Sequence, residues 1–205
     1  MLNNTGFDLW ANDYDKTVQL AEESNEYPFA GYKAVLGTIH QTIIRGGKRV
    51  LDLGLGTGIL AKKLYDDGFS ITGIDFSQAM IDIAQAKMPN ARLIRHDFTA
   101  GVPESLASET FDSIVCTYAI HHLTDPQKIN LLHQLRGMLA PQGCIFIGDV
   151  AFADNAELAA CRAACGDHWD DDEIYPTAEN LTGEFPALHF EAISHCAGII
   201  TIPKH

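Results

Sequence analysis

Three closely spaced glycines constrain the fold of this chain more than any other feature. Residues 50–58 (VLDLGLGTG) place Gly54, Gly56 and Gly58 at every second position, directly after a predicted buried strand. Glycine lets the backbone turn tightly and lets a ligand approach closely, and the N–H groups at the start of a following helix face that ligand. A sharp turn without a ligand requires fewer glycines. We therefore predict a strand–loop–helix unit with a ligand at the loop.

The spacing of these glycines disfavours two other nucleotide sites. A dinucleotide-binding loop has the pattern Gly-x-Gly-x-x-Gly, and Ile59 stands where its third glycine belongs. A phosphate-binding P-loop requires Gly-Lys-Ser or Gly-Lys-Thr, which is absent from this segment. A nicotinamide-dependent oxidoreductase is therefore disfavoured.

Strands and helices are predicted to alternate regularly from residue 49 onward. The predicted strands span residues 49–53, 69–75, 91–97, 111–119 and 144–150. The predicted helices between them span residues 59–67, 77–88 and 125–140, with Ser77 and Asp125 capping the second and third. This order predicts an α/β fold with a doubly wound parallel sheet, and the nearly all-apolar strands indicate that both faces are covered.

The pattern changes after residue 150. Residues 155–165 are Ala-rich and predicted to be helical, and residues 177–184 are predicted to form a short helix. Residues 188–194 and 198–202 are apolar or alternating and joined by a very short link. They predict an antiparallel hairpin at the edge of the sheet.

Two acidic residues belong to the glycine unit. Asp75 ends the second predicted strand, 21 residues after Gly54, where an acid in a doubly wound fold accepts hydrogen bonds from two ribose hydroxyls. Asp75 could instead cap the next helix, although Ser77 is better placed for that. Asp52 lies inside an apolar strand, so its carboxylate needs partners, and the N–H groups of the glycine loop are the nearest candidates.

At these residues the sequence resembles the class I S-adenosylmethionine-dependent methyltransferases. Residues 50–58 are similar to their first motif, residues 73–80 (GIDFSQAM) to their ribose-binding segment, and residues 96–98 (HDF) to their adenine-contacting turn. Residues 111–117 and 139–144 resemble their fourth strand and the turn into their fifth. Residues 7–15 and 169–173 also resemble segments of small bacterial methyltransferases of unassigned substrate.

The resemblance implies S-adenosylmethionine as cofactor and a seven-stranded sheet of order 3-2-1-4-5-7-6 with strand 7 antiparallel. The glycines would flank the methionine part, Asp75 would bind the ribose, and Asp97 would accept from the adenine amino group. The cofactor-binding residues that we predict are Asp52, Gly54, Gly56, Gly58, Asp75, Phe76, Met80, Asp97, Phe98, Thr117 and Tyr118. Phe76 and Met80 would face the adenine, and Thr117 and Tyr118 the sulfonium.

The chain is expected to form a single domain, since 205 residues match one domain in length. Its expected parts are a helical N-terminal lid (1–48), a cofactor-binding core (49–152), an acceptor-side insertion (153–186) and an edge hairpin (187–205). The lid and the insertion carry aromatic residues suited to enclosing a small molecule: Trp10, Tyr14, Tyr27, Phe29, Tyr32, Trp169 and Tyr175.

Methyl transfer requires mainly alignment and the exclusion of water, so few residues are candidates for catalysis. Tyr14 is one, with its hydroxyl near the amino-acid end of the cofactor, unless it packs in the core. His121 and His122 follow the fourth strand, and at most one is expected to face the crevice. His121 is predicted as a base or acceptor contact, with helix packing as the alternative. Asp149 faces the same crevice or caps the Ala-rich helix.

Composition limits the partners. A net charge of −13 disfavours nucleic acid, and no apolar run is long enough for a membrane helix. Residues 167–173 are acidic and include His168, so they could form either a metal site or a solvated loop. We expect a solvated loop without a metal. The odd count of five cysteines and the absence of a signal-peptide pattern predict a cytoplasmic protein. The predicted acceptor is a small molecule; a macromolecular acceptor, or cofactor binding without catalysis, remains the alternative, and the oligomeric state is open.

Overall fold

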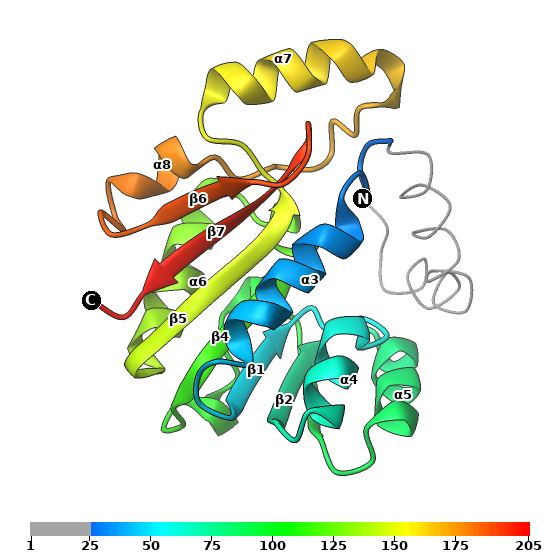
Figure 1. Cartoon of the computed structure of the whole chain (residues 1–205), viewed down its shortest axis with the longest axis vertical. Helices are drawn as coiled ribbons and strands as arrows, with labels where there is room; N and C mark the ends of the chain where they lie inside the picture. The colour runs from blue at the N-terminus through cyan, green and yellow to red at the C-terminus, as the bar shows by residue number, and fades with distance from the viewer. Residues whose placement is uncertain (1–25) are drawn as a thin grey trace.

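The computed structural model describes residues 26–205, which form one seven-stranded sheet with helices around it (Figure 1). The strands are β1 (Arg49–Leu53), β2 (Ser70–Asp75), β3 (Arg92–Arg95), β4 (Phe111–Thr117), β5 (Leu139–Val150), β6 (His189–Ala192) and β7 (Ala197–Pro203). Their order across the sheet is β3-β2-β1-β4-β5-β7-β6. β7 runs antiparallel to β5 and β6, and the other neighbours are parallel. The predicted fold and strand order are confirmed.

The strand order reverses at β1: β2 and β3 lie on one side of it, and β4 and the later strands lie on the other. Leu53, at the end of β1, lies opposite Ile74 of β2 on one side and opposite Cys116 of β4 on the other. The carboxyl ends of these three strands are therefore level at one edge. Open parallel sheets bind ligands at such a point, where the strand order reverses.

Helices cover both faces of the sheet, as the all-apolar strands predict. α3 (Tyr32–Ile43), α4 (Ile59–Asp66) and α5 (Gln78–Lys87) share a buried cluster with Val50 and Val115 on one face. Residues of α6 (Asp125–Gly137) and α8 (Ala178–Thr182) share another with the neighbouring positions Leu51 and Ile114 on the opposite face. In this described part of the chain, no helix combines the length and apolarity needed to cross a membrane.

α7 (Asn155–Cys165) belongs to a third cluster beyond the carboxyl end of β5 (Figure 1). Its buried members come from the segment before α3, the end of β5 and the residues after it, α7, the loop after η4 and the turn between β6 and β7: Ala30, Val150, Phe152, Cys161, Tyr175 and Cys196. The cluster holds the acceptor-side insertion next to the segment before α3. Four short 3-10 helices complete the described chain: η1 (Phe98–Ala100), η2 (Glu104–Leu106), η3 (Ile120–His122) and η4 (Gly166–His168).

The start of β5 differs from the prediction. α6 ends at Gly137, and β5 begins at Leu139, which lies opposite Phe111 of β4. Pro141 is therefore inside the strand and not in a turn before it. The register shifts between Phe111 and Ser113, and this irregularity accommodates the extra residues.

The cap of α6 also differs from the prediction. Thr124, rather than Asp125, is the N-cap residue, and it forms a capping box with Gln127. The Thr124 N–H donates to Gln127 Oε1 at 2.9 Å. Asp125 instead lies in the first turn, where it pairs with Lys128 at 3.0 Å.

Gly58 allows α4 and α5 to approach each other, and its replacement is predicted to destabilise the fold. Gly58 is the N-cap of α4 with φ of 79°, and a Cβ there would lie 2.9 Å from Met88 Cε. Gly58→Ala is expected to lower the free energy of unfolding by about 1–2 kcal/mol or more, since an L-residue is strained at this φ. Urea unfolding measures this effect.

Gly183→Ala is the matched control. Gly183 has φ of −60°, and a Cβ there meets no atom within 4 Å. This variant should be neutral or slightly stabilising. Equal losses of stability in the two variants would contradict the packing role of Gly58.

Candidate functional site

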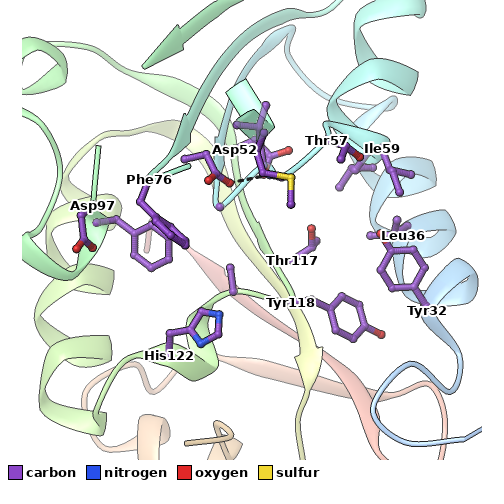
Figure 2. A pocket seen from close by; sticks show the side chains of 18 of the residues that line it. Tyr32, Leu36, Asp52, Thr57, Ile59, Phe76, Asp97, Thr117, Tyr118 and His122 are labelled. Carbon is purple, nitrogen blue, oxygen red and sulfur yellow. Dashed lines mark hydrogen bonds between the residues drawn. The ribbon is translucent and has the colours of Figure 1, made fainter. Parts of the chain in front are cut away.

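A cavity of about 180 Å³ lies at the carboxyl ends of β1, β2 and β4 (Figure 2). Its wall combines the glycine loop after β1 with the residues that follow β2, β3 and β4. Tyr32 and Leu36 of α3 close one side, and His122 of η3 lies on another. The cavity is therefore at the crevice that the strand order predicts.

Asp75 holds the glycine loop in place. Its Oδ2 accepts the Gly56 N–H and its Oδ1 accepts the Ser77 N–H, both at 2.9 Å. Gly56 has φ of 55°, and a Cβ there would meet no atom within 4 Å, so the loop borders open space at this residue. The cap of α5 is Ser77, whose Oγ accepts the Met80 N–H at 3.2 Å. The alternative of Asp75 as the cap is therefore wrong.

Asp52 lies in the cavity wall without the partners that we expected. The Gly56 N–H goes to Asp75, and Asp52 Oδ1 has no hydrogen-bond partner among the described residues. Asp52 is only 1% exposed. Burial, and then the negative charge of Asp75, raise the pKa of Asp52 from 3.8 to about 8. Asp52 is thus a protonated carboxyl at neutral pH, facing a cavity with one oxygen available.

Most of the predicted cofactor-binding residues come together around this cavity. Ten of the eleven line it: Asp52, Gly54, Gly56, Asp75, Phe76, Met80, Asp97, Phe98, Thr117 and Tyr118. Gly58 is absent from the lining and packs against α5. Tyr14 lies outside the described residues.

Several lining residues were not predicted. Leu36 of α3 was not predicted, and Tyr32 of the same helix was predicted to enclose the acceptor and not to contact the cofactor. Leu55 and Thr57 stand between the glycines, so the loop motif itself could have suggested them. Nothing in the sequence indicated that α3 would reach the glycine loop.

Three aromatic rings close the α3 side of the site. Tyr118 packs against Tyr32, with ring centroids 4.9 Å apart, and against Phe29, at 5.7 Å. Tyr118 has φ of 49°, which is unfavourable for a bulky residue. Its N–H donates to Gly148 O at 2.8 Å, so the sheet helps to hold this conformation. Such strain is typical of functional sites.

His121 does not line the cavity; the structure places it behind His122 and against β5. His121 Nδ1 and Asp149 Oδ1 are 2.7 Å apart. Burial alone would lower the pKa of His121, but Asp149 and then Glu173 outweigh it and raise that pKa above its usual value. Asp149 is not a helix cap, because Asp154 caps α7 by accepting two N–H groups.

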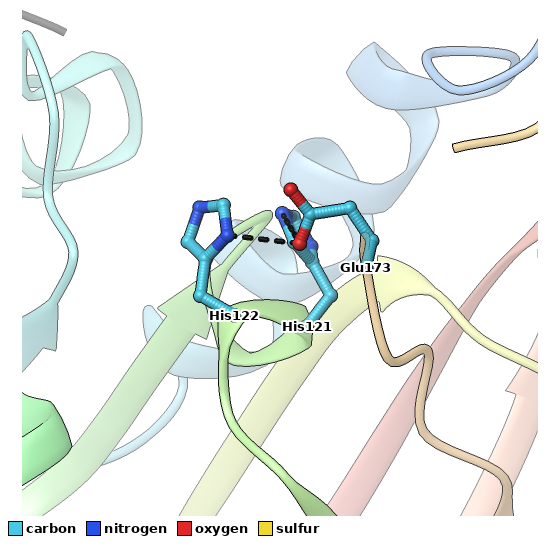
Figure 3. A group of neighbouring side chains, drawn as sticks. All are labelled: His121, His122 and Glu173. Carbon is cyan, nitrogen blue, oxygen red and sulfur yellow. Dashed lines mark hydrogen bonds and ion pairs between the residues drawn. The ribbon is translucent and has the colours of Figure 1, made fainter. Parts of the chain in front are cut away.

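Glu173 reaches both histidines from the insertion (Figure 3). Its Oε2 lies 2.9 Å from His122 Nδ1 and 3.8 Å from His121 Nε2. Burial would raise the pKa of Glu173. The hydrogen bond from His122, and then the charge interactions with His121 and His122, outweigh burial and lower that pKa. Glu173 is thus an ionised partner of the histidines.

The predicted aromatic residues form a second group beside these histidines. Tyr27 stacks on Trp169 with centroids 5.1 Å apart, and its hydroxyl hydrogen-bonds that of Tyr175. Tyr175 also lies edge-on to His121 at 5.7 Å. These rings fill space between the N-terminal segment and the insertion. Of the described aromatic residues that were predicted to enclose the acceptor, Tyr32 alone lines the cavity.

Known proteins resemble the chain in sequence. Residues 50–143 match a family described as a methyltransferase domain. An uncharacterized methyltransferase of Bacillus licheniformis is 33% identical over 192 residues, covering 90% of this chain and 87% of that protein. An uncharacterized methyltransferase of Geobacillus kaustophilus is 36% identical over 193 residues, covering 91% and 87%.

Solved structures share the fold. DhpI in complex with SAH has a TM-score of 0.69 at 19% identity, covering 97% of this chain and 93% of that one. Magnesium protoporphyrin IX methyltransferase from Synechocystis, with bound SAH, has a TM-score of 0.67 at 14% identity, covering 86% and 85%.

Replacing Asp52 by asparagine is predicted to change how stability depends on pH. The folded chain keeps Asp52 protonated up to about pH 8, whereas the unfolded chain releases this proton near pH 3.8. The contribution of Asp52 to stability therefore falls as the pH rises from about 4 to about 8, by at most about 1.4 kcal/mol per pH unit. Urea unfolding between pH 5 and pH 8 should show wild type losing stability relative to Asp52→Asn.

Asp66→Asn, at an exposed carboxylate of α4, controls for the loss of one negative charge. Parallel pH profiles of wild type and Asp52→Asn would contradict the raised pKa.

Proposed function

This chain belongs to the methyltransferase family of its bacterial relatives, and we propose that it transfers a methyl group from S-adenosylmethionine to a small-molecule acceptor. The observation that carries the proposal is the cavity, where the glycine loop meets carboxyl groups from three successive strands, at or near their carboxyl ends. Asp52, Asp75 and Asp97 come from β1, β2 and the turn after β3. Such a wall suits a ligand that carries a positive charge and several hydroxyl groups, because carboxyl oxygens accept hydrogen bonds from hydroxyls and attract cations.

The residues present fit this cofactor. Asp52 offers a buried oxygen without a partner, which suits a cationic group or a donor of the methionine part. The open space at Gly56 allows a ligand to approach the backbone. Phe76, Met80 and Phe98 supply an apolar wall for a flat ring. When bound, S-adenosylmethionine supplies a methyl group activated by a positively charged sulfur.

We assign parts to the lining residues on this basis. Asp75 binds the ribose hydroxyls, since a carboxylate has about four acceptor positions and does not exhaust them on two N–H groups. Asp97 accepts from the adenine amino group, while its Oδ1 also accepts the Thr99 N–H at 2.9 Å. Thr117 and Tyr118 face the sulfur. Gly54 and Gly56 flank the methionine part.

The acceptor side is built by η3 and the insertion. His121 is proposed to act on the acceptor, and Asp149 holds its ring by accepting from Nδ1. Tyr14 is proposed to close the site from the N-terminal segment. Packing of Tyr27 on Trp169 supports a lid shared by the N-terminal segment and the insertion.

A small-molecule acceptor is favoured by charge and enclosure. A net charge of −13 opposes a polyanionic substrate, and the aromatic groups narrow the approach to the histidines. The magnesium protoporphyrin IX methyltransferase shares the fold and is named for a small acceptor. The odd number of cysteines supports a cytoplasmic location. A macromolecular acceptor and cofactor binding without catalysis are the alternatives.

Asp75→Ala is predicted to weaken binding of S-adenosylmethionine by about tenfold or more, since each hydrogen bond to a charged group contributes about 1.5–3 kcal/mol. Calorimetry with S-adenosylmethionine, its demethylated product and NAD measures this. Asp75→Asn tests whether charge alone is needed, and Asp66→Ala is the surface control. Binding of NAD but not S-adenosylmethionine by wild type would overturn the cofactor, and unchanged affinity in folded Asp75→Ala would overturn the ribose role.

The acceptor class is tested with methyl-labelled S-adenosylmethionine and a bacterial extract divided by size. We expect label in the small-molecule fraction with wild type and a strong reduction with Asp75→Ala. Label confined to RNA or protein would favour the macromolecular alternative. Cofactor binding without label in any fraction would favour the non-catalytic one.

A further inference from the structure

Two adjacent histidines and one glutamate form a compact group beside the cavity. His121 and His122 lie on η3, and Glu173 comes from the loop after η4 (Figure 3). One ligand atom from each lies within 4.8 Å of the others, and no other such group occurs in residues 26–205. The three side chains are 12–20% exposed, so they are sheltered but accessible.

The backbone holds this group together. The Ile174 N–H donates to His121 O at 2.9 Å, so the residue next to Glu173 is fixed to η3. Tyr175 is buried and packs edge-on against His121. Glu173 is therefore placed by two neighbouring anchors as well as by its own contacts. The group is organised before any ligand arrives, which favours binding.

Asp149 provides an independent sign of a ligand. It is fully buried, its Oδ1 lies 2.7 Å from His121 Nδ1, and its Oδ2 has no hydrogen-bond partner among the described residues. A carboxylate only accepts, so His121 Nδ1 donates its proton to Asp149, and Nε2 is the ring nitrogen that faces Glu173. A buried carboxylate behind a histidine is the usual support of a metal-ligating imidazole.

We propose that His121 Nε2, His122 Nδ1 and the Glu173 carboxylate bind one divalent transition-metal ion of the Zn²⁺ class. The ion takes the place of the proton that His122 Nδ1 donates to Glu173, and protons on the ligating nitrogens are released to solvent. Two imidazoles and one carboxylate suit zinc in preference to Mg²⁺ or Ca²⁺, which favour oxygen ligands. Three protein ligands leave one position of a tetrahedral site open. This site differs from the metal site considered from the sequence, because His168 is not part of it.

The local charge permits a cation. Lys128 is the positive group nearby, and its Nζ is held by Leu123 O at 2.7 Å and Asp125 at 3.0 Å. Asp149 and Glu173 bring two negative charges to the histidines, and Asp125 offsets Lys128. The balance at the three ligands is therefore negative.

His122 also lines the cofactor cavity, so the ion would stand between that cavity and the insertion. Its open position would take an oxygen, nitrogen or sulfur atom of the acceptor. His121 would then act on the acceptor as a ligand of the ion and not as a free base. This role rests on the proposed function, whereas metal binding itself does not.

The full chain, freed of metal by a chelator, is titrated with Zn²⁺ in a calorimeter and with Co²⁺ by visible absorption. We expect one ion per chain and the intense bands of tetrahedral Co²⁺. Cys161, Cys165 and Cys196 are potential competing ligands, but thiolate binding adds a near-ultraviolet charge-transfer band. That band, or the lack of any response at equimolar ion, would overturn the proposal.

Variants locate the site. His122→Ala and Glu173→Gln should each weaken Zn²⁺ binding at least tenfold, and Asp149→Asn, which changes the support of His121, by about 10–100-fold. His133→Ala is the matched control, because His133 pairs with Glu184 at 3.0 Å on the surface. The Zn²⁺ affinity of this variant should equal that of wild type. Wild-type affinity in folded His122→Ala and Glu173→Gln would overturn the site.

S-adenosylmethionine affinity is measured for wild type and for Glu173→Gln, whose side chain lies outside the cavity lining. Loss of Zn²⁺ binding with cofactor binding retained supports a separate metal site. If wild type binds Zn²⁺ but not S-adenosylmethionine, the metal site stands and the proposed function fails.

Discussion

The Asp75 carboxylate positions the rest of the site. By accepting the N–H groups of Gly56 and Ser77, it joins the loop after β1 to the start of α5. Charge-assisted hydrogen bonds of this kind are stronger than neutral ones, and both are sheltered from water here. The loop is further tied to β2 because Ile74 O accepts the Gly54 N–H at 2.8 Å. The glycine loop is thus shaped by the strand next to its own.

Burial, and then the negative charge of the same carboxylate, raise the pKa of Asp52. Asp75 accepts two N–H groups, whereas Asp52 has an oxygen without a donor and a pKa raised to about 8. The Asp52 oxygen without a partner is costly to bury unless a ligand uses it. A cation in the cavity would favour ionised Asp52, so ligand binding and proton release are expected to be linked. The unpartnered oxygen and the raised pKa of Asp52 are therefore expected to favour a positively charged ligand over a neutral one.

The sequence predicts well which residues line the cavity, because local chemistry decides it there. Glycines, strand-end acids and apolar strands act within one strand–loop–helix unit, and ten predicted residues line the cavity. The start of β5 at Leu139 was missed because pairing with Phe111, a tertiary contact, overrides the turn preference of Pro141. The cap at Thr124 was missed because Asp125 is an equally good cap by type. Leu36 was missed, and Tyr32 was expected only at the acceptor, because the packing of α3 against the glycine loop is a tertiary contact.

The acceptor half depends on contacts that no local pattern reveals. Glu173 lies 51 residues after His122, yet the bond between Ile174 and His121 brings them together. Tyr27 reaches the same place through Trp169 and Tyr175, which belong to the insertion. The loop after η4 and the segment before α3 lie outside the strand–helix alternation, so both can vary with less effect on the sheet than α3 or α8. Acceptor choice is therefore expected to reside in these segments, while the strand ends retain the cofactor chemistry.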